Sequence, residues 1–260
     1  MTFRTVHVDR YISPLREGGS LPAIVEANDQ GLYVLKFRGA GQGKKVLIAE
    51  LVAGELARTA GLPVPELVFA ELDTDLARAE PDPEVQSLIR ASGGLNIAMD
   101  YLPGSLTFDP VAQPVDSELA SKILWFDAFI TNVDRTVKNT NMLVWHKKLW
   151  LIDHGASMIF HYDWPNVGQK ASSPFAMIKD HVLLKHAGEI PKADAQMRSK
   201  ITESEIKRVV ALIPDDWLEG EATFKSVSAH REAYETYFRG RLGASQTFTE
   251  EAIRARAAHV

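Results

Sequence analysis

The feature that most limits the fold of this 260-residue chain is an apolar helical stretch that ends in a polar loop and is followed by a short hairpin. Residues 117–132 carry apolar side chains at helical spacing, and Asp134 and Asn139 follow in the loop, five positions apart. Two short apolar runs then lead to Asp153. This order predicts that Asp134, Asn139 and Asp153 lie close together.

These three side chains offer what phosphoryl transfer requires of a protein. Asp134 can orient an attacking hydroxyl and accept its proton, and Asn139 and Asp153 can hold Mg²⁺ on the phosphates of ATP. The layout is typical of phosphotransferases of the protein-kinase type. We therefore predict catalytic roles for Asp134, Asn139 and Asp153, and metal binding by Asn139 and Asp153.

Composition and charge argue against several other classes of protein. The chain has no cysteine, which rules out disulfides and thiolate metal sites. Its 29 basic and 34 acidic residues leave a net charge of −5, so no general attraction to nucleic acid or anionic lipid is expected. No apolar run approaches the roughly 20 residues of a membrane span, and residues 1–8 lack a signal-peptide pattern. We expect a cytoplasmic protein without a nucleic-acid partner.

The first third of the chain has the pattern of an antiparallel sheet with one helix. Five runs have the β-branched or alternating pattern of strands: 5–12, 21–26, 32–37, 64–72 and 95–102. A helix is predicted over 45–60, where Gly61 ends it. The Pro103-Gly104 step predicts a boundary between an N-terminal lobe, 1–103, and a C-terminal lobe, 104–260.

The second lobe is predicted to be mainly helical. Besides the helix over 117–132, capped by Asp116 or Ser117, helical patterns occur at 202–213, 226–242 and 249–258. The stretch 73–92 is acidic and interrupted by prolines, and 156–201 reads as irregular. The predicted fold class is therefore α+β, with two lobes as in protein kinases.

Lys36 lies in the third predicted strand, where a lysine calls for an anionic partner. The helix that follows offers Glu50 or Glu55, and Glu50 shares its helical face with small residues that permit close approach to a sheet. Such a pair would hold the ammonium on nucleotide phosphates, as in protein kinases. The alternative is a solvated lysine on an edge strand.

Asp100 and Leu102 lie just before the predicted boundary, where an extended strand could offer main-chain groups to an adenine edge. An ordinary buried strand is the alternative. The stretch 39–45 is glycine-rich but is not a P-loop, because Arg38 stands where that motif needs glycine and Lys45 where it needs Ser or Thr.

Gly18, Gly19 and Ser20 separate the first two predicted strands. This turn could cover the phosphates of a nucleotide, and a plain hairpin turn explains it equally well. Other chemistries are poorly supported, because the histidines match no common zinc spacing and the chain has no Gly-x-Ser-x-Gly motif.

In the order and spacing of these residues the chain resembles the HipA-like kinases, whose best-known members are toxins of bacterial persistence modules. The resemblance runs over roughly residues 20–190. It places five residues on the family's phosphate lysine, helix glutamate, catalytic loop and metal-binding aspartate: Lys36, Glu50, Asp134, Asn139 and Asp153. It implies ATP and Mg²⁺ as cofactors and a fold related to protein and phosphatidylinositol kinases.

Departures from the family limit what the resemblance implies. The chain is short and has no separate amino-terminal domain ahead of the strands, which argues against an antitoxin partner. No Ala-Pro-Glu follows in 156–190, so the rules of substrate docking in protein kinases do not transfer. We expect a kinase that phosphorylates a hydroxyl, with protein Ser or Thr as first choice. A small-molecule or phosphoinositide-type lipid kinase, or a catalytically weak nucleotide-binding regulator, stays open.

Overall fold

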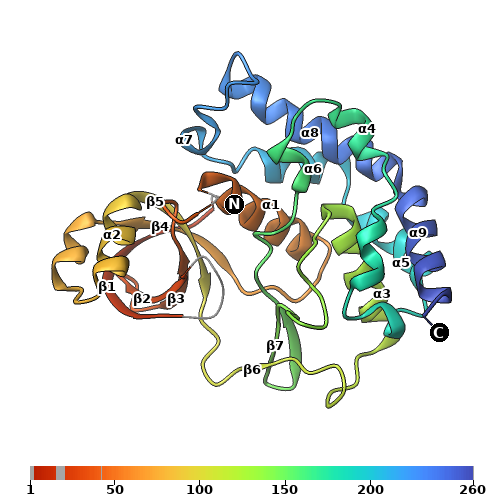
Figure 1. Ribbon diagram of the computed structural model, residues 1–260, viewed down its shortest axis with the longest axis horizontal. Coiled ribbons are helices and arrows are strands. Elements are labelled where there is room, and N and C mark those ends of the chain that lie inside the picture. The colour runs from red at the N-terminus through yellow and green to blue at the C-terminus, as the bar shows by residue number, and fades with distance from the viewer. Residues whose placement is uncertain (1–2, 16–20, 42, 260) are drawn as a thin grey trace. The chain divides into compact units, whose positions relative to one another are not determined.

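The computed structural model of the chain describes residues 3–15, 21–41 and 43–259 (Figure 1). Contacts group the chain into two compact units. Unit 1 comprises Met1–Leu51 and Pro65–Gly104, and unit 2 comprises Val52–Val64 and Ser105–Val260. One division point falls within helix α1 (Lys44–Thr59). The sequence pattern predicted this helix but not a division inside it. The division into two functional lobes at residue 103 stays a prediction.

Unit 1 is built on a closed five-stranded sheet in the order β1-β2-β3-β5-β4. The strands are β1 (Thr5–Pro14), β2 (Ala23–Ala27), β3 (Leu32–Lys36), β4 (Leu67–Leu72) and β5 (Gly94–Asp100). All five match strands that the sequence predicted.

The expectation of a purely antiparallel sheet is wrong at one pair. β1 and β4 run parallel, with Thr5 opposite Phe69, and this pair closes the sheet. A parallel pair needs a long connection, here β2, β3 and α1, and alternation along a strand does not encode its partner. Two register shifts in β1 bend the strand, which helps it pair with β2 and β4.

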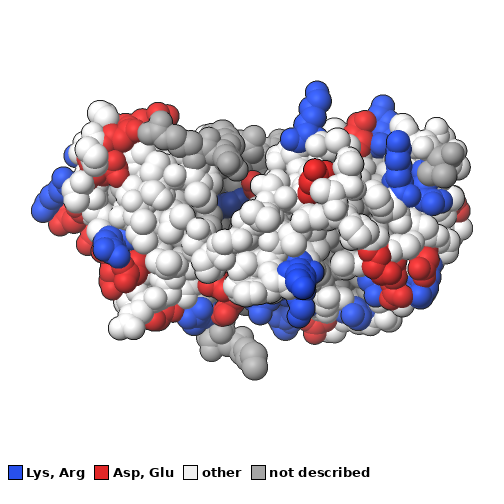
Figure 2. All heavy atoms as spheres, turned by 90° about the horizontal axis from the view of Figure 1, so that it is seen from below, with Lys and Arg blue, Asp and Glu red and all other residues white. Residues whose placement is uncertain are grey.

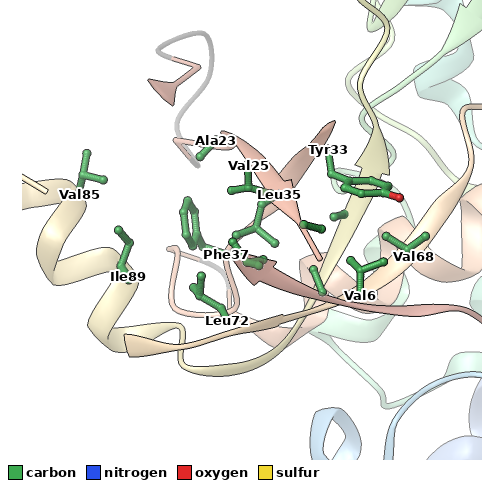
Figure 3. Close-up of a cluster of buried hydrophobic side chains, with 14 of the residues drawn as sticks. Val6, Ala23, Val25, Tyr33, Leu35, Phe37, Val68, Leu72, Val85 and Ile89 are labelled. Atoms are coloured by element: carbon green, nitrogen blue, oxygen red, sulfur yellow. The ribbon is translucent and has the colours of Figure 1, made fainter. Parts of the chain in front are cut away.

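The core of unit 1 fills the inside of the closed sheet (Figure 3). Alternate side chains of the strands meet there, among them Val25, Leu35 and Val68. Helix α2 (Pro83–Ala91) adds Val85 and Ile89 to the same cluster. A 3₁₀ helix (Thr74–Ala79) precedes α2. The acidic, proline-interrupted stretch 73–92 therefore contains two short helices.

Helix α1 follows β3 and its apolar stripe is fully buried. It stops as predicted, because Gly61 adopts φ +78 and its N–H donates to the carbonyl of Arg58.

Unit 2 is mainly helical. Its helices are α3 (Ser117–Ile130), α4 (Val167–Ala171), α5 (Ile190–Lys200), α6 (Glu203–Val210), α7 (Asp215–Leu218), α8 (Val227–Gly243) and α9 (Ser245–Ala257). Asp116 caps α3, which is buried over most of its length and packs against α5 and α9. A helix that is buried on nearly all sides over its second half is expected at the centre of a helical unit.

A small three-stranded sheet completes unit 2. β6 (Leu106–Thr107), β7 (Met142–Trp145) and β8 (Lys148–Leu151) pair antiparallel, and β7 and β8 form the predicted hairpin. The stretch 156–201, read as irregular, contains α4, α5 and three 3₁₀ helices: Ile159–Tyr162, Ala176–Asp180 and Leu184–His186. Helix α5 escaped prediction because its buried apolar side chains are few.

Acidic and basic side chains are interspersed on the face drawn in Figure 2. In the ranges that the structure describes, no helix has both the length and the apolar character needed to cross a membrane.

Candidate active site

Unit 1 contributes a buried ion pair between a strand and a helix. Lys36 is the last residue of β3, and its Nζ donates a hydrogen bond to Oε2 of Glu50 in α1 over 2.9 Å. The two side chains are 8% and 2% exposed. Of the two glutamates that the sequence offered, Lys36 therefore pairs with Glu50, whereas Glu55 accepts from Arg58.

The end of β5 carries the residues predicted to meet adenine. The N–H of Asp100 donates to the carbonyl of Glu66, and the N–H of Tyr101 donates to that of Leu32. Leu102 lies beyond the strand, and within the described residues its N–H has no protein acceptor. Burial, with the Glu66 carboxylate nearby, raises the pKa of Asp100.

The third predicted element of unit 1, Gly18, Gly19 and Ser20, lies outside the described residues. Its role over the phosphates stays a prediction.

In unit 2, the end of α3 sets the direction of the loop that carries Asp134. Thr131 ends the helix in the left-handed conformation, with φ 54. Asn132 then turns the chain, because its Oδ1 accepts from the N–H of Asp134 at 3.1 Å while its Nδ2 donates to Asp127 at 3.0 Å. The loop conformation is thus fixed before the chain reaches Asp134.

Asp134 is half-buried and collects two amide donors on one oxygen. Nδ2 of Asn139 donates to Oδ2 of Asp134 at 2.7 Å, and Nδ2 of Asn141 donates to the same oxygen at 3.0 Å. The predicted pair of Asp134 and Asn139 is therefore in direct contact. Because Asn139 uses its nitrogen here, its Oδ1 can serve a cation.

Asn141 was missed by the sequence reasoning. The available signal was the repeated amide in Asn139-Thr140-Asn141, at the end of the loop that carries Asp134.

Asp153 follows β8 and is tied to the same loop through its neighbour. The N–H of Ile152 donates to the carbonyl of Asn141 at 3.1 Å. Asn141 and Asp153 both have positive φ, 46 and 55, which non-glycine residues adopt rarely and mostly where the surroundings impose it. The hairpin thus brings Asp153 beside the loop of Asp134 and Asn139.

Comparison with known proteins identifies the family. The sequence model of the HipA-like kinases matches residues 8–242. The chain belongs to the HipA-like kinase family. The match spans every residue that the sequence assigned to the site, from Gly18 to Asp153.

Two solved structures that share the fold of this HipA-like kinase are named as kinases. The Helicobacter pylori proinflammatory kinase CtkA superposes with a TM-score of 0.57 at 13% identity, covering 97% of each chain. The Golgi casein kinase with Mn/ADP bound gives a TM-score of 0.51 at 11% identity, covering 96% of this chain and 73% of that one. At such identities the likeness shows the fold alone. No curated protein matches the sequence.

Beneath the loop of Asp134 and Asn139 in this HipA-like kinase lies a charged network that sequence reasoning missed. Asp127 of α3 is fully buried and accepts from Asn132, from Nε of Arg135 at 2.6 Å and from Nε2 of His181 at 2.9 Å. Burial alone would raise the pKa of the Asp127 carboxyl, but Arg135 and His181 hold it well below its ordinary value. The available signal was an aspartate inside the otherwise apolar run 123–130 of that helix.

The donor set of this HipA-like kinase fits Mg²⁺. Asp153 and Asn139 offer a carboxylate and an amide oxygen, the hard donors that Mg²⁺ prefers. In the part of the chain that the structure describes, no group of three or more His, Cys, Asp or Glu is arranged to hold a metal. Mg²⁺ typically takes one or two protein ligands and completes its shell with phosphates and water.

Proposed function

We propose that this HipA-like kinase binds ATP with Mg²⁺ and transfers the γ-phosphate to a hydroxyl, with protein Ser or Thr as the acceptor. The observation that carries the proposal is the arrangement around Asp134. One oxygen of that carboxylate accepts from Asn139 and Asn141, and within the described residues no amide donates to the other oxygen. A carboxylate fixed on one side can direct its second oxygen at an acceptor hydroxyl.

The residues of unit 2 then have distinct tasks. Asp134 orients the acceptor hydroxyl and accepts its proton while the new bond from the acceptor oxygen to the γ-phosphorus forms. The bond from that phosphorus to the bridging oxygen breaks, and ADP leaves with the bonding electrons. Asn139 and Asp153 would hold Mg²⁺, which, when bound, neutralises charge on the phosphate oxygens.

Unit 1 is proposed to bind the nucleotide. Lys36, oriented by Glu50, would contact the phosphates, since a lysine ammonium is a compact positive charge that suits anionic phosphate oxygens. The N–H of Leu102 and the main chain of Asp100 would meet the adenine edge. The turn of Gly18, Gly19 and Ser20 would cover the phosphates. In this proposal the two units act as the two lobes of a protein-kinase-like enzyme.

The two solved neighbours support the choice of cofactor and acceptor. One is named a casein kinase and was solved with Mn/ADP, a nucleotide with a divalent metal, and the other is named a kinase with proinflammatory action. A nucleotide, a divalent cation and a protein acceptor are proposed for this chain by analogy with them.

The test compares wild type with Asp134→Ala and with Asp75→Ala, an exposed aspartate in the 3₁₀ helix of unit 1. Labelled ATP is incubated with each protein and with cell lysate, and label is followed into protein, lipid and small-molecule fractions. We expect label on protein Ser or Thr, a loss of about 10²- to 10⁴-fold for Asp134→Ala, and no change for Asp75→Ala. ATP affinity, measured by calorimetry, should not change.

Transfer unaffected by Asp134→Ala would refute the catalytic assignment. Label in the lipid or small-molecule fraction would refute the protein acceptor. ATP binding with label in no fraction would refute catalysis and favour a nucleotide-binding regulator.

A further inference from the structure

Arg135 follows Asp134 and its side chain turns away from solvent into unit 2. The guanidinium is fully buried. Its Nε donates to Oδ2 of Asp127, and its Nη1 donates to the main-chain carbonyls of Asn141 and, at 3.4 Å, of Ile152. One side chain therefore joins α3 to both strands of the β7–β8 hairpin at the end where that hairpin meets the loop.

The two carbonyls belong to residues that adjoin the candidate catalytic groups. Asn141 donates from its side chain to Asp134, and Ile152 directly precedes Asp153. The N–H of Ile152 also donates to the carbonyl of Asn141. A shift of the Arg135 guanidinium would therefore move the support of Asp134 and the backbone before Asp153 together.

The position of Arg135 is itself fixed from a third segment. The N–H of Leu183 donates to Nδ1 of His181 at 3.0 Å, so the ring proton is on Nε2, which donates to Asp127. The N–H of Val182 donates to the carbonyl of Arg135 at 3.1 Å. Asp127, Arg135 and the 181–183 segment thus form one closed set of contacts, defined here as the anchor.

We propose that Arg135 is a positioning residue. It fixes the positions of Asp134 and Asp153 relative to each other through the carbonyls of Asn141 and Ile152. The proposal rests on the proposed function, because it assigns Arg135 to the support of those two groups. Only a guanidinium suits the task, since its planar fork presents donors in several fixed directions, whereas an ammonium is a single point of charge.

Arg241 provides a matched control in the same unit. It is also fully buried, and it donates to the main-chain carbonyls of Ala128, Ala171 and Ser173. These carbonyls lie outside the candidate site. Replacing either arginine by lysine removes a guanidinium that donates to buried carbonyls. Both variants should therefore lose stability, but only the Arg135 variant should also lose the positioning of the candidate site.

The experiment measures phosphoryl transfer by wild type, Arg135→Lys and Arg241→Lys as a function of Mg²⁺ concentration, at a temperature where all three are folded. We expect Arg135→Lys to lower kcat and to raise the Mg²⁺ concentration for half-maximal rate, each by about 10- to 100-fold, as for residues that support metal ligands. Arg241→Lys should lower the melting temperature and leave the Mg²⁺ requirement unchanged. An unchanged Mg²⁺ requirement in Arg135→Lys, or an equal shift in both variants, would overturn the proposal.

Amide hydrogen exchange on the same proteins gives a readout independent of activity. Exchange should rise in Arg135→Lys in the loop around Asn139 and in the segment around Asp153 together, and in neither for Arg241→Lys. If wild type transfers no phosphate, the proposed function fails, and this joint rise still decides whether Arg135 holds the two segments; its absence would overturn the inference.

A second variant serves if Arg135→Lys does not fold. His181→Gln keeps the ion pair of Asp127 and Arg135 but removes the ring that ties Asp127 to Leu183. It should raise the Mg²⁺ requirement in the same direction by a smaller factor. A folded His181→Gln protein with wild-type Mg²⁺ dependence and wild-type exchange in both segments would contradict the anchor.

Discussion

Each unit of the molecule contains a buried ion pair, and the two pairs differ in construction. In unit 1, the Lys36 ammonium donates to one oxygen of Glu50 at the end of a strand. In unit 2, the Arg135 guanidinium meets Asp127 and also holds two main-chain carbonyls, and Asp127 has further donors. The first pair orients a point charge, and the second joins three segments of backbone.

The difference has an energetic consequence. A buried ion pair can often be replaced by apolar residues of similar volume without loss, because its mutual attraction roughly repays the cost of removing both charges from water. A pair that also satisfies main-chain groups cannot, because its removal leaves buried donors and acceptors unpaired. The main-chain contacts of Arg135 therefore point to a structural role for its pair, whereas we propose that the Lys36 pair serves ligand binding.

The largest effect is expected when the unit 2 pair is replaced by Asp127→Leu with Arg135→Met. The double variant leaves the side-chain donors of Asn132 and His181 without their acceptor. It also leaves the carbonyls of Asn141 and Ile152 without their donor. Each unpaired buried group costs about 1–3 kcal/mol. The free energy of unfolding, measured in urea, should fall by about 3–5 kcal/mol or more. A loss below about 1 kcal/mol would show that the carbonyls do not depend on Arg135.

The contrast also explains what could be read from the sequence. The partners Lys36 and Glu50 lie 14 positions apart on a consecutive strand and helix, so a local pattern predicts their approach. The spacing of Asp134 and Asn139 likewise predicts their contact. The partners Asp127 and His181 are 54 positions apart, and His181 lies in a stretch without a periodic pattern, so no local rule connects them.

The same reasoning separates the predicted from the unpredicted parts of the fold. Strands and long helices follow from alternation and from buried stripes, as in β3 and α3. The parallel pairing of β1 with β4 and the short helix α5 depend on tertiary packing, which the sequence pattern of either segment alone does not contain.

A second, smaller effect is expected in the pH dependence of stability. The folded pKa of Asp127 lies well below its ordinary value of about 3.9, so its stabilisation is complete above that pH and is lost as the pH falls further. Asp127→Asn cannot titrate. Between about pH 4 and pH 2 the unfolding free energy of wild type should fall more steeply than that of Asp127→Asn, by up to about 1.4 kcal/mol per pH unit.

The measurement is a series of urea titrations at fixed salt across this range, with Asp75→Asn as the control for removal of one exposed carboxylate. Parallel curves for wild type and Asp127→Asn would mean that Asp127 is not held ionised by Arg135 and His181.

Replacing both charges should change the free energy of unfolding much less for the unit 1 pair than for the unit 2 pair. Lys36→Met with Glu50→Leu removes two buried charges and fills the same space, so the free energy of unfolding should change by only about 0–1 kcal/mol. Binding of ATP with Mg²⁺ and phosphoryl transfer should nevertheless be lost. A large loss of stability would assign the Lys36 pair to structure, and retained ATP binding would remove it from the proposed site.

The smallest effect is expected at a partly exposed cluster, which sets the baseline for both buried pairs. Glu118 of α3 accepts from Lys122 at 2.6 Å and from Lys192 at 2.6 Å, and these hydrogen bonds lower the pKa of Glu118 to about 2. Such surface pairs are screened by salt and opposed by side-chain entropy. Glu118→Gln should leave the melting temperature in high salt indistinguishable from wild type, with a small decrease confined to low salt. A salt-independent loss as large as that of the unit 2 double variant would mean that burial does not distinguish these ion pairs, and the comparison would fail.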